Sequence, residues 1–321
     1  MTNALNQDTV LAAAIAYKPS ATGEAMQLPE HLAETVSLTY FDLSGIDNRT
    51  NLAVHFKPHA ALQHAPVILS IHGSGLSVYK EPGWPLSCSL ASRGIPVLAV
   101  NTRQHDEAVN TDVFSATIRD IDAAFWMARS LGYRRIILMG HSLGSAQISF
   151  FAANFWDADI GGVILIGMPA QLPWKSRHVL IANENLYNQM VSEANDAVRE
   201  GDFDRVLSTP MPWLGGKATR VTAGHFASYR DENLAVPRSV DWIARVPYPV
   251  LLARDENDPI IRDFEMNEML AAAQAGRPRS VDAVTLRSTP GTDGHSFADT
   301  MSDLTDTIVS WIDKVATRGP L

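Results

Sequence analysis

Three polar residues in this sequence have the types that an activated nucleophile needs. Ser142 is the centre of Gly140-His141-Ser142-Leu143-Gly144, and Asp258 and His295 follow it along the chain. A serine hydroxyl becomes nucleophilic when a base takes its proton, and a third group must orient that base. Serine, acid and histidine in this order predict acyl transfer through a covalent acyl-serine.

The sequence around Ser142 predicts a strand, a tight turn and a helix. An apolar run at residues 135–139 precedes the pentapeptide, and residues 145–154 have a helical pattern. Glycine two residues to either side lets the chain turn sharply and leaves the serine at the tip. The helix N-terminus behind it favours a developing negative charge. The alternative reading of the pentapeptide is a structural turn without chemistry.

His295 is the candidate base among ten histidines. It lies in the glycine-rich stretch Gly291–Phe297, after the last predicted strand and before a closing helix. A loop at this place can hold an imidazole over the C-terminal edge of a sheet. His225 is the main competitor, because a histidine on an inserted segment could also reach the pocket.

Asp258 is the candidate acid, in a stretch that follows the predicted strand at residues 249–253. Asp255 and Glu256 are its neighbours, and any acid here could instead cap a loop. The strand at residues 160–166 is followed by Gly-Met-Pro-Ala, which offers no carboxylate. That absence favours Asp258.

The tetrahedral intermediate of acyl transfer also needs N–H donors for its oxyanion. Leu143 supplies one from its backbone. The second is expected from His72-Gly73-Ser74-Gly75, after the strand at residues 66–71, with Ser74 preferred and Gly75 next. Small residues there let backbone amides approach a substrate oxygen. A plain glycine turn is the alternative.

Several other side chains are candidates for contact with the substrate. Arg103 and His105 follow the strand at residues 96–100, and Arg103 could bind a substrate carboxylate or form a structural ion pair. The segment described below adds His225 and aromatic residues that could line a pocket or fill its own core. These aromatic residues are Trp174, Trp213, Tyr187 and Phe226.

The elements that must position these residues follow an α/β pattern. Short, continuously apolar runs suit strands buried on both faces of a parallel sheet. Such runs lie at residues 66–71, 96–100, 135–139, 160–166, 249–253 and 282–286, and helical patterns at 111–131 and 296–315. Two alternating runs, 35–43 and 51–57, predict an antiparallel hairpin at a sheet edge. We therefore expect a doubly wound sheet.

The strand and helix rhythm breaks between residues 168 and 246. The segment is too long for a plain loop and has helical patterns at 183–200 and 225–232. We interpret it as a helical cap over the active edge, inserted between the core portions 1–167 and 247–321. Two helices packed on the core without any gating role are the alternative. Residues 1–33 form an N-terminal arm with no assigned role.

Composition sets further limits. A net charge of −9, 46 % hydrophobic residues and one cysteine, Cys88, indicate a globular protein without an intrachain disulfide. The acidic balance argues against nucleic acid as a partner. We expect a cytoplasmic protein without a membrane span, with a small-molecule acyl substrate and no metal or cofactor. Homo-oligomer formation is left open.

The chain resembles members of the α/β-hydrolase superfamily. The resemblance rests on His72-Gly73, on residues 140–144, on Asp258 in D-E-N-D-P and on Gly294-His295, over residues 35–167 and 247–321. It implies a mostly parallel, eight-stranded sheet with hydrolytic chemistry. Asp255 departs from the glycine of many relatives. The subfamily is not identified.

A serine nucleophile favours a carboxylesterase-like reaction. A thioesterase, lactonase, amidase or C–C bond hydrolase would use the same three residues, and the sequence does not separate them. A non-catalytic member that binds a ligand in the pocket is the hypothesis from a different class.

Overall fold

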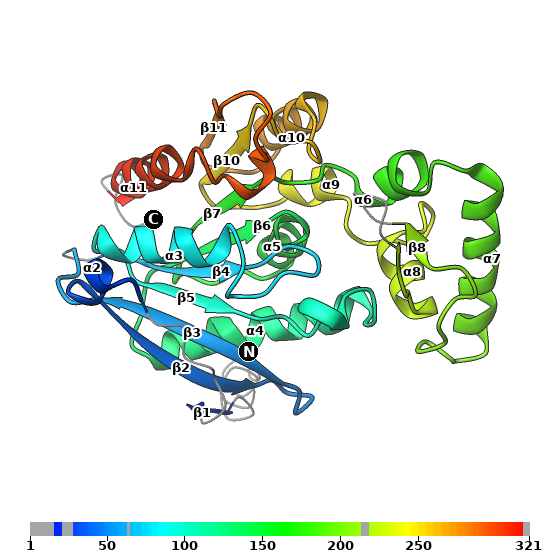
Figure 1. Ribbon diagram of the computed structural model, residues 1–321, viewed down its shortest axis with the longest axis horizontal. Helices are drawn as coiled ribbons and strands as arrows, with labels where there is room; N and C mark the ends of the chain where they lie inside the picture. Colours follow the sequence, from blue (N-terminus) through cyan, green and yellow to red (C-terminus); the bar gives the residue numbers. More distant parts are fainter. Residues whose placement is uncertain (1–15, 21–27, 63–64, 213–217, 317–321) are drawn as a thin grey trace, which may run out of the picture.

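The computed structural model describes residues 16–20, 28–62, 65–212 and 218–316. Its centre is a nine-stranded sheet in the order β1-β2-β3-β5-β4-β6-β7-β10-β11 (Figure 1). The strands from β5 to β11 in this order run parallel, and β1, β2 and β3 are antiparallel to their neighbours. The predicted doubly wound, mostly parallel sheet is confirmed. The strands are β1 (Ala16–Pro19), β2 (Val36–Ser44), β3 (Thr50–Pro58), β4 (Val67–Ile71), β5 (Val97–Val100), β6 (Ile136–His141), β7 (Ile160–Ile166), β10 (Val250–Asp255) and β11 (Val281–Leu286).

The sheet has nine strands, one more than the eight expected, and the additional strand lies at its antiparallel end. The predicted hairpin is present as β2 and β3, but β1 pairs with the outer side of β2. This strand comes from the N-terminal arm, in which α2 (Glu30–Ala33) also forms. The hairpin is therefore not the outermost part of the sheet.

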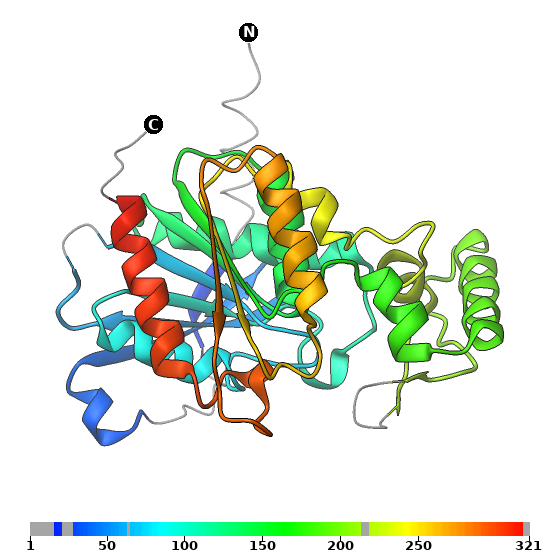
Figure 2. The ribbon, with the colours of Figure 1, turned by 90° about the horizontal axis from the view of Figure 1, so that it is seen from above.

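Helices cover both faces of the sheet, as the buried character of the central strands requires. One face carries α4 (Phe114–Ser130), α5 (Leu143–Asn154), α9 (Ser239–Ile243) and α10 (Asp263–Ala275), and the other carries α3 (Gly83–Ser92) and α11 (Met301–Ala316). Figure 2 shows α10 and α11 on opposite sides of β10 and β11. Each face has its own apolar cluster, with Phe125 and Phe151 in the first and Trp84 and Trp311 in the second.

The closing helix begins later than its periodicity predicts. A short 3-10 turn, η4 (Gly294–Ser296), precedes it, and α11 starts only at Met301. Phe297 has a φ of 56°, in the left-handed region that a continuous right-handed helix cannot contain. This break separates His295 from the helix and gives it a position in a loop.

The chain between β7 and β10 forms a group of elements beyond the ends of the strands. They are α6 (Leu172–Lys175), the π-helical turn η2 (Ser176–Ile181), α7 (Glu184–Arg199), β8 (Met211–Pro212), β9 (Ala218–Thr219) and α8 (Ala223–Tyr229). Of these, α7 lies farthest from the sheet (Figure 1). Tyr187, Met190 and Phe226 bury one another in a separate apolar cluster. The helix α9, near the end of the predicted segment, instead packs in the core through Ile243.

No helix in the described part of the chain has the length and apolarity that crossing a membrane requires.

Candidate active site

Ser142 lies at a sharp turn between β6 and α5. Its φ of 51° and ψ of −121° are unusual for a residue with a side chain. The turn is possible because its neighbours are glycines: a Cβ on Gly140 would lie 2.4 Å from the Gly144 carbonyl oxygen, and one on Gly144 would lie 2.6 Å from the carbonyl oxygens of Ile71 and His72. The strand, turn and helix expected around Ser142 are all present.

The loop after β4 approaches Ser142 closely. A Cβ on Gly73 would lie 2.9 Å from the Ser142 Cβ, so only glycine fits at this point. Gly75 has a φ of 66°, which glycine adopts without steric cost. On the other side, Leu143 is the first residue of α5, and the first N–H groups of a helix have no acceptor within it. Backbone amides from both elements therefore lie near the serine.

His72 holds this loop in place from behind. Its Nδ1–H donates to the Gly73 carbonyl oxygen at 2.7 Å, and its Nε2 accepts from the Thr102 N–H at 3.0 Å. Burial lowers the pKa of His72 to about 4, so the ring is neutral and can make both hydrogen bonds at neutral pH.

His295 and Asp258 are joined by a short hydrogen bond. The His295 Nδ1 lies 2.8 Å from Asp258 Oδ2, and the Asp258 carboxylate is fully buried. Its Oδ1 accepts from the backbone N–H groups of Ile260 at 2.7 Å and Ile261 at 2.9 Å. These contacts place the proton on Nδ1 of the imidazole, which leaves Nε2 free to accept another.

The Asp258 carboxylate is stabilised in its charged form. Burial alone would raise its pKa, but the hydrogen bond and charge of His295 and the two backbone N–H groups outweigh burial, so the pKa of Asp258 lies below its ordinary value. Asp255, the alternative acid, accepts from Ser288 at 2.6 Å and from Thr300 at 2.8 Å. Asp255 therefore ties together the loops around β10, while Asp258 contacts the imidazole.

His141 supports His295 from the side that faces the sheet. The two rings have centroids 4.6 Å apart, and the His141 Nε2 donates to the His295 carbonyl oxygen at 3.1 Å. Burial, and then the charge of His295, lower the pKa of His141 well below its usual value. A neutral His141 can pack against His295 without electrostatic repulsion.

Ser142 and His295 open into the same cavity of about 200 Å³. We call the part of its lining that comes from the sheet edge the sheet wall: Ser74, Leu76, Ser142, Leu143, Pro169, Ile260, Ile261 and His295. The rest comes from the elements between β7 and α9, and we call it the segment wall: Leu172, Lys175, Leu180 and Arg230. Most of the lining is apolar. The structure therefore brings Ser74, Leu143, Ser142 and His295 together around one space.

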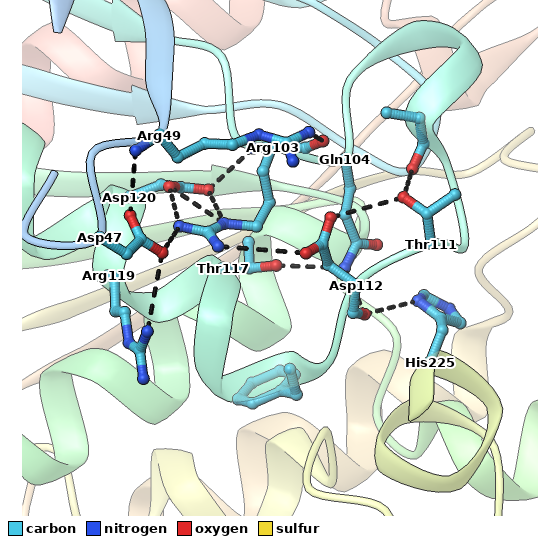
Figure 3. A network of polar contacts seen from close by, with 12 residues as sticks. Asp47, Arg49, Arg103, Gln104, Thr111, Asp112, Thr117, Arg119, Asp120 and His225 are labelled. Carbon is cyan, nitrogen blue, oxygen red and sulfur yellow. Dashed lines mark hydrogen bonds and ion pairs between the residues drawn. The ribbon is translucent and has the colours of Figure 1, made fainter. Parts of the chain in front are cut away.

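Arg103 does not line this cavity, which corrects its candidate role as a substrate ligand. Its guanidinium forms a two-pronged ion pair with the buried Asp120 and a 2.7 Å hydrogen bond to Asp47 (Figure 3). Asp120 also accepts from the Arg103 backbone N–H at 2.8 Å. The alternative of a structural ion pair is the one that the structure shows. The helical pattern places Asp120 on the polar side of α4. It is nevertheless buried, because the Arg103 guanidinium pairs with it there.

Three other candidate contacts also lie outside the cavity lining. His225 is fully buried, stacks on Tyr229 with ring centroids 4.2 Å apart, and donates from Nδ1 to the Asp112 carbonyl oxygen (Figure 3). His105 lies 3.1 Å from Asp106. Trp174 is 38 % exposed and packs against Phe264. These residues are corrected to structural or surface positions.

The remaining aromatic candidates divide in the same way. Tyr187 and Phe226 fill the apolar cluster between α7 and α8, which is the second of the roles considered for them. Trp213 lies outside the described residues.

The two cations in the segment wall, Lys175 and Arg230, are not among the residues predicted from the sequence. Lys175 is buried in an ion pair with Glu265, its Nζ 2.6 Å from Oε2. Arg230 follows α8 and is fully buried. Neither residue follows a strand of the sheet. Only their position in the segment expected to cover the site could have indicated that they line the cavity.

Within residues 16–20, 28–62, 65–212 and 218–316, no cluster of three or more His, Cys, Asp or Glu side chains is arranged to hold a metal ion.

The comparisons with known proteins agree with this architecture. A sequence profile of the alpha/beta hydrolase family matches residues 68–303, which is most of the chain. The protein therefore belongs to the alpha/beta hydrolase family. No curated protein sequence matches it significantly.

Many solved structures share this fold, and three of them illustrate how different their sequences are from this one. Est1E from Butyrivibrio proteoclasticus is 16% identical, with a TM-score of 0.62 over 88% of this chain and 99% of its own. The esterase Pf2001 of Pyrococcus furiosus is 12% identical, with a TM-score of 0.58 over 92% and 97%. DcsB, in complex with a substrate analogue, is 13% identical, with a TM-score of 0.63 over 87% and 99%. Identities this low show a shared fold.

Proposed function

We propose that the protein is a serine hydrolase that cleaves a carboxylic ester through an acyl-enzyme intermediate. The observation that carries this proposal is one cavity shared by Ser142, at a strained turn before a helix N-terminus, and by His295, which Asp258 holds by a 2.8 Å hydrogen bond. Strain of this kind at a cavity is typical of functional residues. The fold shared with the esterase of Pyrococcus furiosus supports the same reaction class.

The proposed acylation step uses each group once. The Ser142 Oγ attacks the ester carbonyl carbon while His295 Nε2 takes the hydroxyl proton. The carbonyl oxygen becomes an oxyanion, which accepts hydrogen bonds from the N–H groups of Leu143 and Ser74, with Gly75 next to them. When the intermediate collapses, the C–O bond to the alcohol breaks, and His295 returns the proton to that oxygen.

Deacylation repeats the same steps with water. His295 removes a proton from water, whose oxygen attacks the acyl carbon, and Ser142 leaves with the proton that His295 returns. The products are the carboxylic acid and the regenerated serine. Asp258 stays ionised throughout, because its lowered pKa favours the carboxylate that stabilises the imidazolium.

The segment of residues 168–246 is proposed as a cap over this site. Leu172, Lys175, Leu180 and Arg230 line the cavity opposite the sheet wall, so the segment completes the space in which the ester binds. Its separate apolar cluster supports this role, because the helices α7 and α8 can keep their own packing away from the core.

The test is hydrolysis of p-nitrophenyl esters from acetate to octanoate by wild type and Ser142→Ala. Loss of the nucleophile should lower the rate of hydrolysis by about 10⁴- to 10⁶-fold. The dependence of the wild-type rate on acyl-chain length would show how long an acyl group the cavity accepts. Covalent labelling by a fluorophosphonate should disappear in the same variant. Ser149→Ala is the matched control, because Ser149 lies further along α5 and bonds only to the Ser145 carbonyl oxygen. Equal rates in wild type and Ser142→Ala would overturn the proposal.

A further inference from the structure

Lys175 joins the segment between β7 and β10 to the loop that carries Asp258. This loop consists of residues 256–262, between β10 and α10, and we call it the acid loop. Lys175 is the last residue of α6, and its Nζ donates to the Ile260 carbonyl oxygen at 2.5 Å and to Glu265 Oε2 at 2.6 Å. Lys175 and Glu265 are both buried. The ammonium therefore contacts the acid loop directly, across 85 positions of the chain.

The Ile260 carbonyl belongs to the same peptide group as the Ile261 N–H. That N–H donates to Asp258 Oδ1 at 2.9 Å. The other carboxylate oxygen, Asp258 Oδ2, lies 2.8 Å from His295 Nδ1. A continuous row of hydrogen bonds thus runs from Lys175 Nζ, through one peptide group and the Asp258 carboxylate, to the imidazole of His295.

A cation at the carbonyl end of a peptide group makes its N–H a stronger donor, because hydrogen bonds in a row polarise one another. The Ile261 N–H is one of the groups that hold the pKa of Asp258 below its ordinary value. A stronger donor at this place fixes the carboxylate more firmly, and the carboxylate in turn orients the imidazole. Lys175 can therefore affect His295 without touching it.

The neighbouring peptide group shows that this contact is specific. The Arg254 Nε also anchors the acid loop, since it donates to the Ile261 carbonyl oxygen at 2.8 Å. However, the N–H of that peptide group belongs to Arg262 and donates to Glu265 at 3.0 Å, not to Asp258. Lys175 is thus the cation bound to the peptide group that donates to the acid.

We propose that Lys175 is a positioning residue of the hydrolase, which holds and polarises the peptide group between Ile260 and Ile261 and thereby fixes Asp258 against His295. This inference rests on the proposed function, because it concerns the same serine, acid and base. It also makes turnover depend on the segment, since the peptide group has its cationic partner when α6 is docked on the acid loop.

The simpler role for Lys175 is to pin α6 to α10 through its ion pair with Glu265. Two variants separate the roles. Glu265→Gln breaks the ion pair but leaves Lys175 in contact with the Ile260 carbonyl oxygen. Lys175→Met/Glu265→Gln also removes that contact, and it leaves no buried charge without its partner. Because both variants share the change at Glu265, the difference between them isolates the contact with Ile260.

The double variant should have a kcat for p-nitrophenyl butyrate about 10- to 100-fold below that of Glu265→Gln, the loss expected when a catalytic group is slightly misplaced. Its KM should change less, because the group displaced is the base and not the ester. Arg177→Gln is a control for the loss of a cation from the segment. Arg177 pairs with Glu184 and Glu232, within the segment, so this variant should keep the wild-type kcat.

Proton NMR of ¹⁵N-histidine-labelled protein tests the same link without turnover. The Nδ1 proton of His295 lies in a short hydrogen bond to a carboxylate and should give a far-downfield signal, identified by its absence in His295→Gln. The signal should persist in Glu265→Gln. In the double variant it should move upfield or broaden through exchange with water.

Equal kcat and the same downfield signal in Glu265→Gln and the double variant would overturn the inference, and Lys175 would then serve to pin α6 to α10. A raised KM with unchanged kcat and signal would overturn it as well, because Lys175 would act on the substrate in the cavity that it lines. If wild type cleaves no p-nitrophenyl ester but the signal still moves in the double variant, the proposed reaction fails and the link from Lys175 to Asp258 stands.

Discussion

The two walls of the cavity are built by different means. The sheet wall is fixed by backbone geometry: the turn at Ser142, the close approach of Gly73 and the N–H groups that hold Asp258 all depend on main-chain atoms. The segment wall is fixed by side chains, with Arg230 held by Ser176 and Asn110. The sheet wall therefore tolerates few substitutions, whereas the segment wall, apart from Lys175, can change its charge and shape one side chain at a time.

This difference separates the proposed reaction from its substrate specificity. Acyl transfer requires a nucleophile, a base and oxyanion donors at fixed positions, which the sheet edge can provide. Recognition of a particular substrate depends on the groups opposite them. Changes in the sheet wall should thus abolish turnover or folding, and changes in the segment wall, apart from Lys175, should alter preference or pH response.

Asp258→Asn should have the largest effect. The amide oxygen can still accept from Ile260 and Ile261, but the Nδ1–H of His295 loses its anionic partner. The kcat for p-nitrophenyl butyrate should fall by about 10⁴-fold, because the imidazole loses its preferred tautomer and the charge that stabilises its protonated form. Circular dichroism should show an intact fold.

The control for this prediction is Asp293→Asn. Asp293 accepts from the backbone N–H of His295 but does not contact its ring in the way Asp258 does. Its replacement should lower kcat less than about tenfold, as expected for an exposed position. Equal losses in both variants would show that the loop conformation matters and that Asp258 has no special role.

Gly144→Ala should destabilise the folded protein at the sheet wall. The new Cβ would lie 2.6 Å from two backbone carbonyl oxygens at the end of β4, and neither can move without shifting the strand. We expect a loss of about 3 kcal/mol in the free energy of unfolding, measured by urea denaturation. Gly83→Ala is the matched control, since no atom lies within 4 Å of its Cβ position. At the start of α3 it should be neutral or stabilising by up to about 1 kcal/mol.

The sequence predicted the central sheet well because its strands have a strong local signal. Residues such as those of β4 and β6 are apolar on both faces, and the polar residues that follow them must lie at one edge. Ser142, Asp258 and His295 could be chosen on that basis. The strand β1 was missed, because four residues that pair only with β2 leave no clear pattern.

Arg103 and Arg230, two of the buried arginines, show why the rest was harder to predict. Arg103 lies in the loop after β5, where a site residue is expected. However, it is neutralised by Asp47 and Asp120, which lie 56 and 17 positions away along the chain. Arg230 follows a short helix in the segment, and its contacts with Ser176 and Asn110 span 54 and 120 positions. Partners this distant depend on tertiary packing, which periodicity and spacing do not encode.

The smallest predicted effect concerns His225, which lies in α8, the helix that ends just before Arg230. Burial, and then the charge of Arg230, lower the pKa of His225 well below its usual value. In the unfolded chain the histidine has an ordinary pKa of ~6.5, so the unfolded chain takes up a proton first as the pH falls. From pH 6.5 downward, His225 should reduce the free energy of unfolding by up to about 1.4 kcal/mol per pH unit.

The measurement is urea unfolding at pH 7.5, 6.5, 5.5 and 5.0 for wild type, His225→Gln and Tyr229→Phe. Glutamine removes the titrating group, so the difference in unfolding free energy between wild type and this variant should shift in favour of the variant by about 2 kcal/mol from pH 6.5 to 5.0. Tyr229→Phe keeps the ring that stacks on His225, and burial raises the pKa of Tyr229 to about 12, far above this range. Its difference from wild type should stay constant. A constant difference for His225→Gln as well would mean that His225 titrates alike in the folded and unfolded chains, and that burial beside Arg230 does not disfavour its protonated form.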